Sequence, residues 1–190
     1  SKKNINFLFI GRLLKDKGIL EFINVAKEVK KNKKIRATFS VIGSIDSKNS
    51  SSISYNDYLK FKNKKILNFF GQKKNIKKYL LRSDCIVLPS YREGLPRVLL
   101  ESSAMGIPAI TTNVPGCREV VKDGYNGFLC QAKSEKSLLK AINRFMNVST
   151  KKRLIMGQNS RKKAETYFDE KIVFKRYKKL INQLKQWNKI

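Results

Sequence analysis

The chain has 190 residues, of which 42 are lysine or arginine and 14 are aspartate or glutamate, and its formal net charge is +28. The absence of histidine excludes every histidine-dependent catalytic triad, imidazole base and His-ligated zinc site. The three cysteines form no C-x-x-C pair, which excludes a disulfide framework and a cysteine-cluster zinc site and suits a reducing compartment. No apolar run in the sequence approaches the roughly 18 residues of a membrane span.

The excess of positive charge leaves three explanations open. Lysine outnumbers arginine 32 to 10, whereas specific recognition of phosphates and bases relies on the planar fork of arginine. The charge therefore reflects a lysine-rich genome, a role beside anionic lipid, or nucleic-acid binding. Aromatic residues that could stack on bases do not interleave the basic runs, so we expect no nucleic-acid partner.

Short apolar runs that stop at glycine or proline alternate with stretches of helical spacing. The expected strands are Ile5–Ile10, Ala37–Ile42, Ile66–Phe70, Cys85–Leu88, Ala109–Thr112 and Gly127–Cys130. The expected helices are Ile19–Val29, Ile76–Leu81, Arg97–Met105, Arg118–Val121, Ser137–Met146, Lys151–Tyr167 and Lys171–Trp187. This alternation predicts an α/β fold, a Rossmann-like parallel sheet with helices on both faces. We expect one domain over residues 1–190, with C-terminal helices from about residue 134 to residue 190.

The last expected helix carries an apolar stripe. Its members are Val173, Tyr177, Leu180, Ile181, Leu184 and Trp187. Such a stripe more often docks on a core than on a partner, so we expect it mainly to pack on this domain.

Ligands of such sheets bind in the loops that follow the carboxyl ends of the strands. The first of these loops, Gly11–Gly18, reads GRLLKDKG and matches neither a dinucleotide-binding nor a P-loop motif. It places Arg12 and Lys17 five residues apart, where they could clamp a diphosphate without a metal. Solvated surface charge explains this loop equally well.

The loop after the fourth expected strand, PSYREGLPRVLLE, carries two glutamates. Glu93 precedes Gly94 at the mouth of a helix, and Glu101 lies about one and a half turns inside it, so we expect Glu93 at the rim and Glu101 deeper. Carboxylates accept hydrogen bonds from hydroxyls, and free N–H groups at a helix start attract phosphate, which together describe a nucleotide sugar. A capping glutamate and a salt-bridged helical glutamate explain the spacing as well.

Both loops, and the segment that follows the second one, resemble segments of one enzyme family. The E-x7-E spacing from Glu93 to Glu101 resembles the signature of glycosyltransferase family four, the retaining GT-B enzymes. GRLLKDKG is similar to that family's G-R-L-x-x-x-K-G loop, and Ser103–Cys130 is similar to the segment after the second glutamate. The segments EGLPRVLLE and PGCREVV are most similar to those of bacterial capsule and lipopolysaccharide glycosyltransferases.

The resemblance implies roles for individual residues. Glu93, Arg12 and Lys17 are the expected catalytic residues: the two cations hold the donor diphosphate, and Glu93 accepts hydrogen bonds from the transferred sugar. A second group is expected to bind the donor. It comprises Glu101 at the ribose, the amides of Gly94 and Leu95 at the sugar or phosphate, and Gly71 and Gln72 near the base. No D-x-D motif occurs, which is consistent with donor binding that needs no metal and no cofactor.

The sequence also departs from the family pattern. Pro96 stands where many members have a second glycine, which removes one backbone donor. The second strand leads into GSIDSKNSSSIS rather than the commoner G-D-G-P turn. The resemblance further implies that this is the C-terminal, donor-binding half, with an N-terminal acceptor domain absent. In related enzymes the last helix returns toward that domain, so the resemblance also implies that part of its apolar face is exposed here.

The resemblance therefore predicts the UDP-sugar-binding domain of a retaining, metal-independent glycosyltransferase that serves bacterial surface polysaccharide synthesis. Its acceptor is expected to be a lipid-linked saccharide held by the missing domain, so the fragment alone should be inactive. We expect a cytoplasmic location, with peripheral association at the inner face of the plasma membrane. A sugar-nucleotide epimerase and a noncatalytic basic module that binds nucleic acid or membrane remain alternatives.

Overall fold

The computed structural model describes residues 4–32, 35–64 and 66–187. Six parallel strands form one sheet in the order β3-β2-β1-β4-β5-β6. Their bounds are β1 Ile5–Ile10, β2 Ala37–Ile42, β3 Asn68–Phe69, β4 Cys85–Leu88, β5 Ala109–Thr112 and β6 Gly127–Cys130. All six predicted strands are confirmed, although β3 is shorter than the expected Ile66–Phe70.

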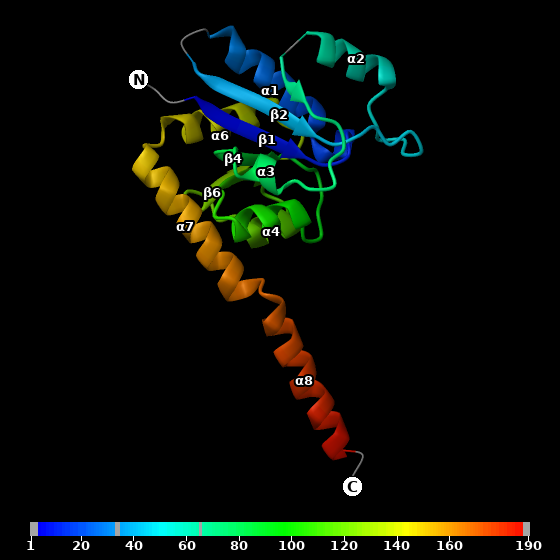
Figure 1. Cartoon of the computed structure of the whole chain (residues 1–190), viewed down its shortest axis with the longest axis vertical. Helices are drawn as coiled ribbons and strands as arrows, with labels where there is room; N and C mark the ends of the chain where they lie inside the picture. Colours follow the sequence, from blue (N-terminus) through cyan, green and yellow to red (C-terminus); the bar gives the residue numbers. More distant parts are fainter. Residues whose placement is uncertain (1–3, 33–34, 65, 188–190) are drawn as a thin grey trace.

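Helices cover both faces of the sheet, as predicted (Figure 1). Helix α1 packs on α6, and on the other face α4 packs on α7. The helices are α1 Ile19–Lys31, α2 Tyr55–Asn63, α3 Lys77–Leu80, α4 Arg97–Ala104, α5 Pro115–Val120, α6 Glu135–Asn147, α7 Thr150–Tyr167 and α8 Glu170–Trp187. Right-handed crossovers place α1 and α4 on opposite faces because the chain leaves β1 in one direction and β4 in the other.

Aromatic side chains fill the layer between the sheet and α1 and α6. Phe7 stacks on Phe39 with ring centroids 5.1 Å apart and meets Phe145 edge-on at 5.8 Å. Phe22 of α1 meets Phe39 at 5.7 Å. Such pairs stabilise a core by about 0.5–1.5 kcal/mol beyond the apolar area that they bury. They therefore fix the central strands whose carboxyl ends carry the candidate site.

One helix, α2, is not among the predicted elements. Ser54 caps it by accepting a hydrogen bond from the Asp57 amide at 3.0 Å. The spacing of these two residues, S-x-x-D, is a recognised helix-start signal that could have revealed α2. Polar residues dominate the helix otherwise, so hydrophobic periodicity alone does not identify it.

The apolar stripe of α8 does not dock on this domain. Figure 1 shows α8 extending away from the sheet, and all five described members of the predicted stripe are exposed. These are Val173, Tyr177, Leu180, Ile181 and Leu184; the Trp187 side chain lies outside the described residues. The expectation of core docking is therefore wrong. Among the described helices, none is long and apolar enough to cross a membrane.

The chain reverses direction across the sheet between β1 and β4. From β1 it proceeds outward to β2 and β3, and from β4 it proceeds the other way to β5 and β6. Such a switch point opens a crevice at the carboxyl ends of the two neighbouring strands. In this protein the two loops that border the crevice are in contact. A Cβ added at Gly18, in the loop after β1, would lie 2.2 Å from the carbonyl oxygen of Pro89, which follows β4.

We therefore predict that Gly18→Ala destabilises the domain more than Gly124→Ala. Both glycines have positive φ, +74° and +71°, but no described heavy atom lies within 4 Å of the Cβ position at Gly124. Gly124→Ala should cost about 1 kcal/mol of backbone strain, and Gly18→Ala about 2–4 kcal/mol because the loops must also separate. Thermal unfolding measures both, and equal losses would contradict the tight contact.

Candidate active site

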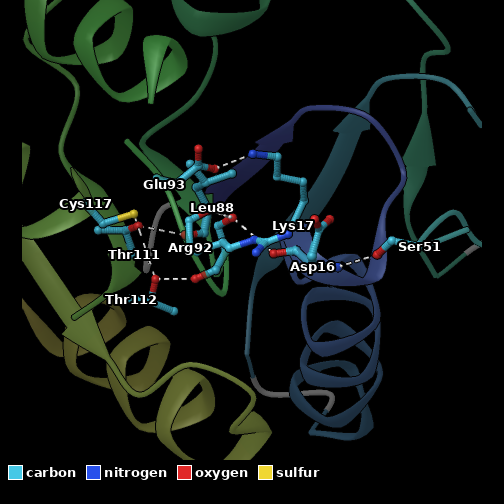
Figure 2. Close-up of polar contacts among 10 residues, drawn as sticks. Asp16, Lys17, Ser51, Leu88, Arg92, Glu93, Thr111, Thr112 and Cys117 are labelled. Atoms are coloured by element: carbon cyan, nitrogen blue, oxygen red, sulfur yellow. Dashed lines mark hydrogen bonds and ion pairs between the residues drawn. The ribbon is translucent and has the colours of Figure 1, made fainter. Parts of the chain in front are cut away.

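The centre of the candidate site is an ion pair between two loops. Lys17 follows β1, Glu93 follows β4, and the Lys17 Nζ lies 2.7 Å from the Glu93 Oε1. Figure 2 shows the two side chains extending toward each other across the gap between the loops. The Glu93 side chain is only 11% exposed. The structure thus brings together two of the three predicted catalytic residues.

Backbone contacts fix the turn that carries Lys17. Lys15–Lys17 forms a short 3-10 turn, and the Tyr91 amide donates to the Asp16 carbonyl at 2.8 Å. The hydroxyl of Ser90 donates to the same carbonyl at 3.1 Å. From a third loop, the hydroxyl of Ser51 accepts a hydrogen bond from the Asp16 amide at 3.1 Å (Figure 2). Two neighbouring loops, the one after β4 and the one after β2, therefore hold the turn that carries Lys17.

Arg12, the third predicted catalytic residue, points to a different loop. Its guanidinium donates to Asp46 at 2.7 Å, in the segment that follows β2, and its side chain is 57% exposed. An exposed pair of this kind contributes about 0–1 kcal/mol to stability. Asp46 therefore restrains Arg12 only weakly.

The predicted base-binding residues lie beside that same segment. Gly71 has φ +67°, and its carbonyl accepts a hydrogen bond from the Gly43 amide at 3.0 Å. The Gln72 side chain accepts from the Ser44 hydroxyl at 3.4 Å. The loops after β2 and β3 thus form one wall, and Arg12 is joined to it.

Gly94 and Leu95 begin the approach to α4. Leu95 is exposed, and Pro96 is the N-cap of α4 rather than a residue of its first turn. A Cβ added at Gly116 in α5 would lie 1.9 Å from the Gly94 carbonyl oxygen. Gly116 is therefore required for the close packing of α5 against the Glu93 loop, a role that was not predicted from the sequence.

Glu101 does not join the ion pair. It accepts from the Arg97 guanidinium at 2.9 Å on α4, and its side chain is 35% exposed. It also lines a hollow of about 320 Å³ between α4 and α7, with Arg161 and Phe168 among the other lining residues. The expectation that Glu93 lies at the rim and Glu101 deeper is wrong, because Glu93 is the more buried carboxylate.

Titratable groups next to the loops are held in their neutral forms. Burial, with a hydrogen bond to the Glu21 carboxylate, raises the pKa of Tyr91. Burial also raises the pKa of the Cys117 thiol. Within the described ranges, no group of three or more cysteine or acidic residues is placed to hold a metal ion.

We predict that breaking the Lys17–Glu93 pair from one side destabilises the fold more than removing both charges. Lys17→Met leaves a mostly buried carboxylate without its partner and should cost about 1–3 kcal/mol. The double variant Lys17→Met/Glu93→Gln should recover part of that loss because no unpaired charge remains. Denaturant unfolding measures both, and a double variant less stable than Lys17→Met would contradict this account.

The chain is similar to known glycosyltransferases. Residues 1–163 match the family described as "Glycosyl transferases group 1". The capsular polysaccharide biosynthesis glycosyltransferase CapM of Staphylococcus aureus is 32% identical over 190 residues, which cover 94% of this chain and 47% of CapM. The N,N'-diacetylbacillosaminyl-diphospho-undecaprenol alpha-1,3-N-acetylgalactosaminyltransferase of Campylobacter jejuni is 32% identical over 188 residues. The matched region covers 96% of this chain and 47% of the Campylobacter jejuni protein.

A solved structure supports the same fold. HepE from Anabaena, in complex with UDP, has a TM-score of 0.82 at 20% identity over 95% of this chain and 49% of HepE. The chain spans about half the length of the curated relatives it matches. The resemblance predicted from the two loop motifs is confirmed, and the fold is that of a Rossmann-like domain of GT-B enzymes. The chain belongs to the glycosyl transferases group 1 family.

Proposed function

We propose that this domain binds a nucleotide sugar, a UDP-hexose or UDP-N-acetylhexosamine, for a retaining glycosyltransferase that needs no metal. The observation that carries the proposal is the Lys17–Glu93 pair at the switch point between β1 and β4. A cation and a carboxylate 2.7 Å apart offer adjacent partners for a phosphate and a sugar hydroxyl.

Lys17 and Arg12 hold the diphosphate in this proposal. Lys17 has three N–H donors, so it can keep one on Glu93 and direct another to a phosphate oxygen. Arg12 exchanges Asp46 for the diphosphate, which its exposure and weak pairing permit. The two cations also stabilise the negative charge that develops on the departing UDP, the role that a metal ion plays in other enzymes.

The carboxylates and loop amides bind the remaining parts of the donor. Glu93 accepts from the hydroxyls of the transferred sugar, and the Gly94 and Leu95 amides face the sugar or the phosphates. Glu101 turns from Arg97 to the ribose hydroxyls. The wall at Gly71 and Gln72 contacts the base. The exposure of Glu101 and Leu95 supports their access to a ligand.

The names of two relatives support our proposal for the acceptor and the cellular setting. The Campylobacter jejuni relative is named for a diphospho-undecaprenol substrate, and the Staphylococcus aureus relative for capsular polysaccharide synthesis. We extend to this chain a lipid-linked saccharide acceptor and a role in bacterial surface polysaccharide synthesis. The enzyme then works in the cytoplasm at the inner face of the plasma membrane, where anionic lipid attracts a net charge of +28.

The 190 residues alone bind the donor but do not transfer sugar in this proposal. Transfer requires an acceptor aligned with the anomeric carbon and protected from water, which a second domain provides by closing over the cleft. The relatives are about twice as long as this chain, which leaves room for such a domain. The exposed apolar face of α8 then packs against it.

The proposal predicts that Lys17→Ala weakens UDP binding about 10- to 100-fold, the effect of losing one charge-assisted hydrogen bond. Lys15→Ala is the matched control, because Lys15 is an exposed lysine of the same 3-10 turn and its replacement should change affinity by less than about twofold. Calorimetry with UDP and uridine measures both variants. Uridine binding should not respond to either change, since uridine has no diphosphate.

Two results would contradict the proposal. Equal losses in Lys17→Ala and Lys15→Ala would mean that general positive charge, not a placed lysine, attracts UDP. A requirement for magnesium, seen as loss of UDP binding in EDTA, would mean that a metal bridges the diphosphate.

A further inference from the structure

We infer that Tyr91 and Glu21 are positioning residues, which together hold the Glu93 loop in register with Lys17. The Tyr91 hydroxyl donates to the Glu21 Oε1 at 2.5 Å. Glu21 lies in the first turn of α1, and Tyr91 lies two residues before Glu93. The hydrogen bond thus joins the helix that follows Lys17 to the loop that carries Glu93. This inference rests on the proposed function, because it concerns the same donor site.

Other contacts join the same two segments. The Asp16 carbonyl accepts from both the Tyr91 amide and the Ser90 hydroxyl. The Pro89 carbonyl lies against Gly18. The segments 16–21 and 89–93 are therefore joined by three sets of contacts, at Gly18, at Asp16 and at Glu21. Removing the Tyr91–Glu21 bond leaves the Asp16 and Gly18 contacts in place but takes away the side-chain bond to α1 two residues before Glu93.

The burial of Glu21 indicates that this contact has a purpose beyond stability. Glu21 is 8% exposed, and in the described part of the chain its Oε2 atom is buried without a hydrogen-bond partner. Burying a carboxylate with one oxygen unpaired costs free energy that an apolar residue at this position would not. Natural proteins retain such costs most often at functional sites.

Tyr91 is held as a permanent donor. Burial is the largest cause that raises the pKa of Tyr91, and the nearby carboxylates of Glu21, Asp16 and Glu135 raise that pKa further. The Lys133 Nζ lies 5.3 Å from the ring centroid and covers the ring from the segment after β6. The phenol therefore stays protonated over the working pH range, and the bond to Glu21 does not switch.

The pair acts on the donor only through the loop. Tyr91 reaches toward α1, whereas Glu93 reaches toward Lys17 (Figure 2 shows the latter pair). A displacement of about 1 Å at a group that holds the donor sugar can reduce its contribution substantially. The geometry assigns to Tyr91 and Glu21 the task of preventing that displacement.

The test compares Tyr91→Phe, which removes only the hydroxyl, with two changes at Glu21. Tyr91→Phe and Glu21→Leu should each weaken UDP-sugar binding about 3- to 10-fold. Glu21→Gln keeps an oxygen acceptor for the tyrosine and should stay within about twofold of the wild type. Ser160→Ala is the control, because it removes a buried hydroxyl whose bond to the Asn126 carbonyl, 3.1 Å long, belongs to α7 and not to the site.

A double-variant cycle separates positioning from general stability. In a Glu93→Gln background, Tyr91→Phe should change UDP-sugar affinity by less than about twofold, because its effect passes through Glu93. An undiminished loss in that background would overturn the inference. So would an affinity loss in Ser160→Ala as large as that in Tyr91→Phe.

Amide hydrogen exchange provides a readout that needs no ligand. Tyr91→Phe should accelerate exchange at the amide of Tyr91, which donates to the Asp16 carbonyl, and at the amide of Lys17, which donates to the Leu14 carbonyl within the turn that the Tyr91 loop contacts. If the wild-type chain binds no nucleotide, the proposed function fails, and amide exchange alone then tests the positioning inference. Unchanged exchange at both amides would then overturn the positioning inference.

Discussion

The site depends on one constraint of topology, the adjacency of β1 and β4 at the point where the sheet changes direction. Because these two strands are neighbours, residues 76 positions apart in the chain, Lys17 and Glu93, meet at 2.7 Å. The closeness of Gly18 to the Pro89 carbonyl and the shared Asp16 carbonyl exist for the same reason. A different strand order would separate the cation from the carboxylate.

Much of the fold could be predicted because buried parallel strands consist of unbroken apolar runs. Ile5–Ile10 and Cys85–Leu88 stop at a glycine and a proline, and both are strands with the expected bounds. The sequence also predicted that Lys17 and Glu93 both lie at the carboxyl ends of strands, although it did not predict that the two side chains form an ion pair. Sequence pattern therefore placed the two central loops at one edge of the sheet.

The remaining features depend on long-range contacts that no local pattern contains. Glu21 and Tyr91 are 70 residues apart, and neither stands out in the sequence. Arg12 has its partner in Asp46, on the loop after β2, which is one of the two places where the sequence departs from the family pattern. The stripe on α8 shows why periodicity has limits: it reports that a helix face is apolar, but not what covers that face. For this reason the docking of α8 was predicted wrongly.

The most direct test of the account is an amide chemical-shift titration of the isotope-labelled chain with UDP. The account predicts that the largest changes occur at Lys17, Gly18, Gly94 and Leu95, on the two loops that the β1–β4 switch point brings together. Changes confined to the hollow between α4 and α7, with those four amides unmoved, would contradict it.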